Sequence, residues 1–308
     1  MYLSFFKKQV RVLFCLFLFF LAGVSYFFWG GSSYYFFIPI HIDEYWGTPM
    51  VQIEIGEKNY QVELDLGTKL STLSRKELGE IDKKFYGSFS SLDIHGNTYE
   101  SDIYQVFGVK IYDFFVPAMK IREESSAFVN NSAMEGDSDK ILCLGRIGRE
   151  VFEGKNFLLD FSRSRVILCK NFRDLYRDEY KAQNFIQVPF LINTNGICFQ
   201  VETDTGTKTL VLDSGSSHSL MRQSLSELNL STQSFYHLPL WQSKKFILGD
   251  FDFGPKDFYL FEISSLVTNM DGILGMDFLK EHAVYLDIGR SVAYIEFISV
   301  SNIPVSSI

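Results

Sequence analysis

Short apolar runs separated by turn residues make up most of this chain. Residues 61–64, 105–111 and 157–160 are rich in valine, phenylalanine, leucine and isoleucine, a composition typical of β-strands. The segments Gly56-Glu57-Lys58-Asn59 and Asp204-Thr205-Gly206-Thr207 stand between such runs and have the composition of hairpin turns. The pattern therefore predicts an all-β body built from short strands.

Two distant stretches follow the same order of strand, turn, strand and aspartate. Val51-Gln52-Ile53-Glu54 leads through a turn to Leu64-Asp65-Leu66-Gly67-Thr68. Phe199-Gln200-Val201-Glu202 leads through a turn to Leu212-Asp213-Ser214-Gly215-Ser216. Both distances to the aspartate are fourteen residues (65 − 51 and 213 − 199). Two equivalent aspartates in one chain suggest two half-sites that together form one site.

The repeat extends beyond these aspartates. Four further pairs match in the same order along the chain, and they are residues 37–39 with 187–189, 74–77 with 224–227, 145–152 with 272–279, and Asp160 with Asp287. The second pair has the composition of a helix capping box in both copies. Matched segments in a constant order indicate an internal duplication.

The duplication predicts two lobes, residues 36–170 and residues 186–308, joined by a linker helix over 171–185. The helix is inferred from the charged segment 172–183, which lies between the repeats. The stretch from the aspartate to the second glycine of the downstream motif has 83 residues in lobe 1 (148 − 65) and 62 in lobe 2 (275 − 213). We expect the surplus to include a surface loop over 123–140, which is rich in polar residues.

The N-terminal segment predicts a membrane anchor. Lys7, Lys8 and Arg11 precede residues 12–29, eighteen residues without a charge. That length is close to the minimum for a helix that crosses a hydrocarbon core of about 30 Å. Basic residues before the span predict a cytoplasmic N-terminus and a body on the other side. We therefore expect residues 1–30 to form a cytoplasmic N-terminus and a single transmembrane anchor for the protein.

A cleavable signal peptide is the alternative to this anchor. Gly23 and Ser25 are small enough for a cleavage site, and the body would then be secreted. The aromatic residues Tyr26-Phe27-Phe28-Trp29 suit a membrane interface and favour an uncleaved anchor.

Charge and cysteine content exclude several kinds of site. The net charge of −8 argues against nucleic acid as a partner, and no stretch rich in lysine or arginine follows the N-terminal segment. No CxxC spacing, paired histidine or glycine-rich phosphate loop is present, so the sequence predicts neither a metal nor a cofactor. Cys143, Cys169 and Cys198 allow one disulfide outside the cytoplasm, with no pairing favoured.

The motifs around the two aspartates resemble those of the pepsin and retropepsin aspartic peptidases. The second copy is the closer match, with Val211-Leu212-Asp213-Ser214-Gly215-Ser216-Ser217 followed by residues 272–279, Gly-Ile-Leu-Gly-Met-Asp-Phe-Leu. The resemblance covers residues 36–300. It implies a two-lobed, acid-protease-like β-barrel fold and an endopeptidase that cleaves a peptide or protein substrate. Because one chain holds both motifs, it also implies activity as a monomer.

The resemblance implies that Asp65 and Asp213 form a catalytic dyad. Two carboxylates that share one site cannot both ionise freely, so one keeps a proton, and the pair acts as base and acid toward a water molecule. The pair titrates jointly, and the sequence assigns the proton to neither aspartate. In the active-site loops, Gly67 and Gly215 would shape the turns. Thr68 and Ser216 would orient the carboxylates.

Leu66 departs from the family pattern, which has threonine or serine after each catalytic aspartate. Ser214 fits that pattern, but Leu66 has no hydroxyl, so half of the hydrogen bonding between the two loops must be lost or replaced. The departure leaves a second function open. This is a catalytically degenerate protease-fold protein that acts as a membrane-anchored peptide-binding or assembly module.

Three other features have competing interpretations. Asp204-Thr205-Gly206-Thr207 resembles the motif, but the repeat places it on a hairpin turn. Residues 91–106 are a candidate flap with His95-Gly96 at its tip, or an ordinary exposed hairpin. His218 lies beside Ser216 and Ser217, which would suit a serine-nucleophile enzyme. Residues so close in sequence seldom have the required geometry.

Overall fold

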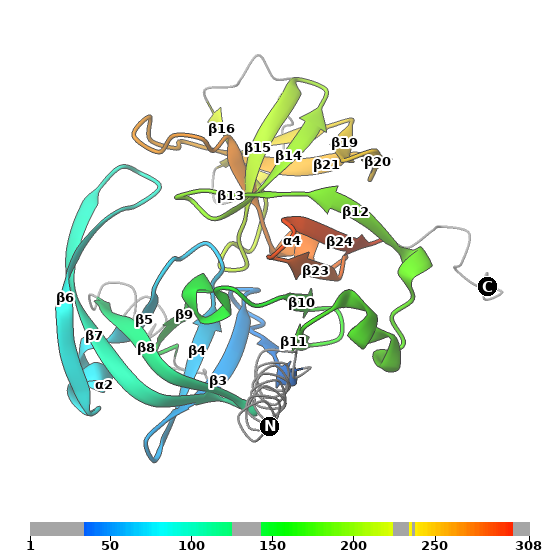
Figure 1. The fold of residues 1–308 in the computed structure, drawn as a ribbon. Helices are drawn as coiled ribbons and strands as arrows, with labels where there is room; N and C mark the ends of the chain where they lie inside the picture. Colours follow the sequence, from blue (N-terminus) through cyan, green and yellow to red (C-terminus); the bar gives the residue numbers. More distant parts are fainter. Residues whose placement is uncertain (1–33, 125–142, 224–233, 236–237, 298–308) are drawn as a thin grey trace, which may run out of the picture. The chain divides into compact units, whose positions relative to one another are not determined.

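The computed structural model describes residues 34–124, 143–223, 234–235 and 238–297 (Figure 1). The chain divides into two compact units, and nearly all of the described residues belong to the second of them, which begins at Phe36.

Three predicted segments lie wholly or mostly outside the described residues. They are the anchor over 12–29, the loop over 123–140 and the second capping box at 224–227. Within the described part of the chain, no helix has the length and apolar character needed to cross a membrane. The anchor therefore stays a prediction.

The first lobe is built on an eight-stranded sheet with the order β2-β3-β4-β9-β5-β8-β7-β6. Its strands are β2 (His41–Ile42), β3 (Pro49–Ile55), β4 (Lys58–Leu64), β5 (Ser71–Ser74), β6 (Lys83–Leu92), β7 (Thr98–Ile111), β8 (Phe114–Glu124) and β9 (Gly145–Ile147). An additional pairing of β3 with β7 curls the sheet back on itself. Helix α2 (Arg75–Gly79) follows β5, and the Ser74 side chain accepts a hydrogen bond from the Glu77 amide, as the first capping box predicts.

The second lobe is built on a ten-stranded sheet with the order β17-β18-β21-β16-β22-β15-β14-β19-β20, and β13 also pairs with β14. Its strands are β13 (Leu191–Ile192), β14 (Ile197–Thr203), β15 (Gly206–Leu212), β16 (Leu220–Arg222), β17 (Ser234–Phe235), β18 (Leu238–Ser243), β19 (Phe246–Leu248), β20 (Phe251–Asp252), β21 (Lys256–Phe261) and β22 (Gly272–Leu274). Helix α4 (Met276–Leu279) follows β22.

A third, six-stranded sheet joins the lobes in the order β1-β11-β10-β23-β24-β12. Its strands are β1 (Tyr35–Pro39), β10 (Phe157–Asp160), β11 (Arg165–Cys169), β12 (Phe185–Pro189), β23 (Val284–Asp287) and β24 (Val292–Glu296). Every residue of β10 and β23, the central pair, is buried, so both faces of this sheet are covered. The sheet mixes strands from both repeats, and the lobe limits given above stay predictions.

The same path of five strands occurs in both lobes, as an internal duplication predicts. It runs β3-β4-β9-β5-β8 in the first lobe and β14-β15-β22-β16-β21 in the second (Figure 1). The parallel pairs also correspond, with β4 beside β9 and β15 beside β22. The predicted hairpin turns stand between β3 and β4 and between β14 and β15.

The predicted helix over residues 172–183 is not continuous. Two short 3-10 helices, η2 (Phe172–Asp178) and η3 (Ala182–Asn184), take its place. Glu179 has a left-handed backbone with φ 72° and ends η2. The two buried side chains of η2 are three residues apart, which suits the three-residue turn of a 3-10 helix. The charged composition of the segment did not distinguish between the two kinds of helix.

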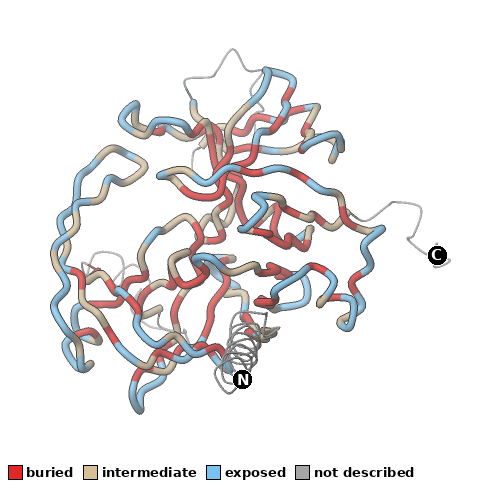
Figure 2. Tube along the Cα trace, viewed as in Figure 1, coloured by how far each residue is buried: buried red, intermediate tan, exposed pale blue. Residues whose placement is uncertain are grey.

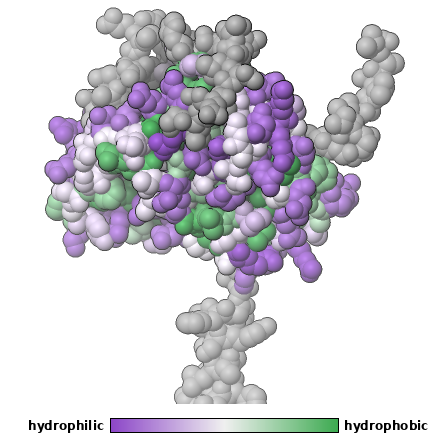
Figure 3. Space-filling model, turned by 90° about the horizontal axis from the view of Figure 1, so that it is seen from above, coloured by the Kyte–Doolittle hydropathy of each residue, from purple (hydrophilic) through white to green (hydrophobic). Residues whose placement is uncertain are grey.

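Burial is concentrated at the middle of each lobe and in the joining sheet, whereas the β6–β7 hairpin is mostly exposed (Figure 2). Strand β4 buries alternate side chains, Tyr60, Val62 and Leu64, as one face of a sheet against a core requires. On the face drawn in Figure 3, apolar residues form small separate patches among polar ones.

Candidate active site

Both aspartates stand where an apolar strand ends. Asp65 follows β4 and Asp213 follows β15, and each strand lies beside a parallel partner. The Asp65 amide donates to the carbonyl of Ile147 at 3.0 Å, and the Asp213 amide donates to the carbonyl of Leu274 at 3.0 Å. The two copies of the motif thus have the same backbone frame, and each frame fixes where its carboxylate points.

The two loops meet so closely that only glycine fits between the carboxylates. A Cβ atom on Gly67 would lie 2.4 Å from Cγ of Asp213, and one on Gly215 would lie 2.6 Å from Cγ of Asp65. Each carboxylate therefore packs on the backbone of the opposite loop, and any larger residue would displace it. The structure brings Asp65 and Asp213 together as the duplication predicts.

Within each loop, backbone amides hold the carboxylate. The Thr68 amide donates to Oδ1 of Asp65 at 3.0 Å, and the Gly215 amide donates to Oδ1 of Asp213 at 2.8 Å. The Ser216 hydroxyl instead donates to the carbonyl of His218, so it does not orient Asp213 as the resemblance implies.

Hydroxyl bonding between the loops exists on one side only. The Leu66 amide donates to Oγ of Ser214 at 3.0 Å, and that hydroxyl donates to the carbonyl of Leu64 at 2.6 Å. Leu66 is fully buried and offers no hydroxyl in return. One of the two bonding arrangements that the family pattern implies is therefore present, through Ser214.

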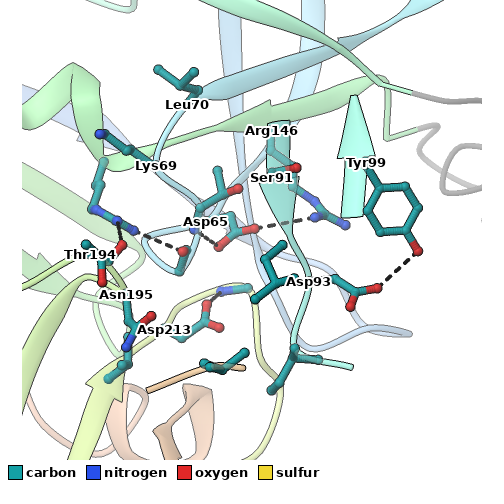
Figure 4. Close-up of a pocket in the computed structure, with 18 of the residues that line it drawn as sticks. Asp65, Lys69, Leu70, Ser91, Asp93, Tyr99, Arg146, Thr194, Asn195 and Asp213 are labelled. Atoms are coloured by element: carbon teal, nitrogen blue, oxygen red, sulfur yellow. Dashed lines mark hydrogen bonds and ion pairs between the residues drawn. The ribbon is translucent and has the colours of Figure 1, made fainter. Parts of the chain in front are cut away.

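Arg149 supplies a different connection, from the lobe 1 active-site loop to another part of lobe 2. It begins η1 (Arg149–Phe152), and its Nη1 donates to the carbonyl of Gly67 at 3.0 Å. Its Nη2 donates to the carbonyl of Thr194 at 3.1 Å, in the turn between β13 and β14 of the second lobe (Figure 4). One side chain thus joins the lobe 1 active-site loop to lobe 2, where Leu66 cannot.

A second arginine lies beside the first aspartate. Nη1 of Arg146, on β9, is 3.6 Å from Oδ2 of Asp65 (Figure 4). Its Nε donates to Oε2 of Glu63 at 3.0 Å. Burial opposes the charged guanidinium, but Asp65, Glu124 and Glu63 outweigh it and raise the pKa of Arg146. The guanidinium is therefore a permanent cation next to the dyad.

The surroundings of Asp213 favour its protonated form. Burial and, after it, the charge of Asp65 raise the pKa of Asp213 to about 8. Burial and the same Asp65 charge also raise the pKa of Glu63, to about 7. These directions favour a proton on Asp213.

The dyad opens into a cavity of about 740 Å³, a size typical of ligand sites. Asp65, Gly67 and Thr68 line it from the first lobe, and Asp213, Gly215 and Ser216 line it from the second. Leu66 and Ser214 are buried behind them. Both arginines, Arg146 and Arg149, also face the cavity.

The β6–β7 hairpin covers this cavity. Its tip, residues 93–97, lies against the second lobe. The Ser264 amide donates to the carbonyl of Ile94 at 2.9 Å, and the ring centroids of His95 and Phe261 are 5.0 Å apart. The Ile94 side chain packs on an apolar cluster, which consists of Cys198, Val211, Ile263, Met270 and Ile273. The hairpin coincides with the candidate flap and is closed in this structure.

The loop that receives the tip is held by Arg222. Its guanidinium donates four hydrogen bonds to backbone carbonyls, which belong to Ile263, Ser264, Val267 and Met270. On the hairpin, Asp93 accepts a bond from the Tyr99 hydroxyl (Figure 4). It also accepts bonds from Asn97, so the tip has its own internal bonding. Two ordered segments therefore meet at this contact.

The remaining candidates have structural roles or lie elsewhere. Asp204 stands on a hairpin turn and accepts a bond from the Ser243 hydroxyl. The Ser217 hydroxyl and Nδ1 of His218 are 3.0 Å apart, but neither residue lines the cavity. Asp160 and Asp287 each accept a backbone amide three residues ahead, as turn aspartates do.

The cysteines of the described residues form no disulfide in this structure. All three cysteines described there are free, and burial raises the pKa of each thiol. No group of metal-ligating side chains occurs among the same residues.

The arginines are the part of the site that sequence reasoning missed. In the matched motifs, Arg146 stands where the second copy has Ile273, and Arg149 where it has Met276. A charge at an apolar position of the repeat was the available signal.

No protein-family model matches the chain, and no curated protein sequence matches it. Its fold is similar to that of conglutin gamma, a basic 7S globulin from lupine seeds, with 12% identity, a TM-score of 0.56, and coverage of 88% of this chain and 96% of that one. Basic 7S globulin from soybean gives 11% identity, a TM-score of 0.53, and coverage of 86% and 95%. Such low identities establish the fold alone, an all-β, two-lobed, pepsin-like fold, and this fold class was predicted.

Replacing Arg149 tests its role in joining the lobes. We expect Arg149→Met to lower the free energy of unfolding by on the order of 2 kcal/mol, because hydrogen bonds from a charged donor contribute about that much. Chemical denaturation measures the change. The control is Arg75→Met, because Arg75 is 83% exposed and its ion pair with Glu123 should contribute little. Equal effects of the two substitutions would contradict the assignment.

Replacing Ile94 tests the closed hairpin. We expect Ile94→Ala to weaken the contact by about 1 kcal/mol through lost apolar burial. That change increases the open population roughly fivefold. Hydrogen exchange of the Ser264 amide, which bonds to the tip, measures the opening. Phe85→Ala, an exposed position on the same hairpin, serves as the control. Unchanged exchange in Ile94→Ala would show that the side chain does not hold the tip.

Proposed function

We propose that the protein is an aspartic endopeptidase that hydrolyses peptide bonds with a water molecule activated between Asp65 and Asp213. One observation carries the proposal, namely the close packing of each carboxylate on the glycine of the opposite loop. An ordinary pair of turn aspartates has no need of such an approach, which like charges oppose.

The raised pKa of Asp213 supports a division of labour in this reaction. One carboxylate accepts a proton from water as the water oxygen bonds to the peptide carbonyl carbon. The other carboxyl donates its proton to the carbonyl oxygen. When the C–N bond breaks, a proton passes to the leaving nitrogen. Water is the nucleophile, so the reaction requires no cofactor.

The cavity suits an extended peptide. It runs between the two lobes and beneath the β6–β7 hairpin, whose residues 89–94 line it. A peptide there would pair with strand edges and place side chains against the walls. Both aspartates belong to one chain, which supports activity as a monomer. If the predicted anchor is retained, the body works on the non-cytoplasmic side of a membrane.

A second function is a peptide-binding or assembly module that does not cleave. Two observations favour it. Leu66 lacks the family hydroxyl, and Arg146 forms an ion pair with one of the two aspartates. Both leave the cavity and the hairpin in place, so the two functions differ in cleavage and not in binding.

Substituting each aspartate separates the two functions. We expect the full-length protein to cleave members of a peptide library between pH 3 and pH 8. We expect Asp65→Asn and Asp213→Asn each to reduce kcat by at least about 1000-fold, because each substitution removes one of the two groups that carry protons. Asp204→Asn, which alters the similar motif on the hairpin turn, should cleave like the wild type. Binding of peptides without cleavage by the wild type would favour the second function.

The pH dependence follows from the direction of the Asp213 shift. Activity needs a proton on one aspartate, and that proton is lost as the pH rises through the raised pKa of Asp213, about 8. We therefore expect kcat/KM to persist to neutral pH and to fall above it. A pH–rate profile measures this, with circular dichroism at each pH to confirm that the fold is intact. A basic limb below pH 5 would contradict the expectation.

A further inference from the structure

The two lobes place different chemistry at one equivalent position beside the dyad. On β9, Arg146 is paired across the sheet with Glu63 and with Thr72. On β22, Ile273 holds the corresponding position. It is paired with Val211 and Leu220, both apolar residues. A row of ionic and polar side chains in lobe 1 thus replaces an apolar row in lobe 2.

Because of this difference, one of the two carboxylates has a cation beside it and the other, within the described part of the chain, does not. Nη1 of Arg146 lies 3.6 Å from Oδ2 of Asp65, and the Arg146 side chain is only 26% exposed, so water screens the pair weakly. Among the described residues, Asp213 has no cation within ion-pair distance. The cation is therefore placed on the Asp65 side of the pair (Figure 4).

Among the described residues, no other charged group around Asp65 takes over the ion pair that Arg146 makes. Glu63 on β4 and Asp213 after β15 are acidic, so neither supplies the positive charge that Arg146 places beside Asp65. Glu124 on β8 acts on the same guanidinium. Arg149 on η1 directs its Nη atoms to backbone carbonyls, not to the carboxylate. Arg146 is thus the cation that ion-pairs with Asp65 within the described part of the chain.

We propose that Arg146 is a positioning residue that keeps Asp65 as the carboxylate of the dyad and leaves the shared proton on Asp213. The inference deepens the proposed function and rests on it. Asp65 is then the group that takes a proton from water, and Asp213 is the group that gives its proton to the carbonyl oxygen. The apolar surroundings that lobe 2 gives to Asp213 favour the protonated, neutral form of this carboxyl.

The proposal is tested on the full-length protein with three substitutions. Arg146→Met removes the charge and keeps an unbranched side chain of similar length. Arg146→Lys keeps the charge. Glu63→Gln removes a second ion-pair partner of Arg146 and leaves Asp65 paired, so it separates a role toward the dyad from a role in the ion pair with Glu63. Thermal denaturation checks that each variant is folded.

Two readouts are used. One is the acid limb of kcat/KM against pH, which reports the first ionisation of the dyad. The other is carbon NMR of protein labelled with ¹³C at the aspartate carboxyls, with signals assigned through Asp65→Asn and Asp213→Asn. The NMR titration reports ionisation whether or not the protein cleaves peptides.

We expect Arg146→Met to raise the first midpoint of the dyad by at least about one pH unit, the effect of losing a nearby opposite charge. Arg146→Lys should restore most of that shift, and Glu63→Gln should not produce it. An unchanged midpoint in Arg146→Met overturns the proposal. Equal shifts in Arg146→Met and Glu63→Gln also overturn it, because they would assign Arg146 to the ion pair with Glu63 alone. A shifted NMR midpoint in a protein that cleaves nothing supports the effect of Arg146 and refutes only the peptidase function.

Discussion

The close approach of two carboxylates is the constraint on which this structure depends. Asp65 and Asp213 repel each other when both are charged, so the rest of the fold has to hold them in place. Glycine at two positions allows the approach, and strand ends in each lobe fix the direction. The hydroxyl of Ser214 then ties the two loops together, and the guanidinium of Arg149 ties the lobe 1 loop to the turn between β13 and β14. A joining sheet with a fully buried central pair supports both halves.

The duplicated frame does not make the lobes chemically equal. In lobe 2, the strands behind the dyad present apolar side chains and a hydroxyl in the expected position. In lobe 1, the equivalent strands present charges, and an arginine bond to carbonyls takes the place of the missing hydroxyl. Backbone geometry is thus preserved where side-chain chemistry has changed. This is possible because backbone hydrogen bonds between strands, which involve no side-chain atoms, set the frame.

The features that the sequence predicted are those with local or repeated signals. Composition located the strand at 157–160, and turn residues located the two hairpins. The repeat separated Asp213 from Asp204, although the four residues at Asp204 look more like the family motif than those at Asp65 do. The linker was predicted as one helix because its charged residues suit helices of either kind. Arg149 was missed because its partner Thr194 is 45 residues away, and no local pattern predicts a contact between two lobes.

Because the hairpin is closed, the affinity of a ligand for the cavity depends on hairpin opening as well as on contacts with the cavity walls. A ligand that needs the space filled by Ile94 binds only the fraction of molecules in which the tip has lifted. Its apparent dissociation constant is the intrinsic one divided by that fraction. Ligands could thus differ in apparent affinity according to whether they displace the tip or fit beneath it. The hairpin would then select among ligands by their bulk on the lobe 2 side.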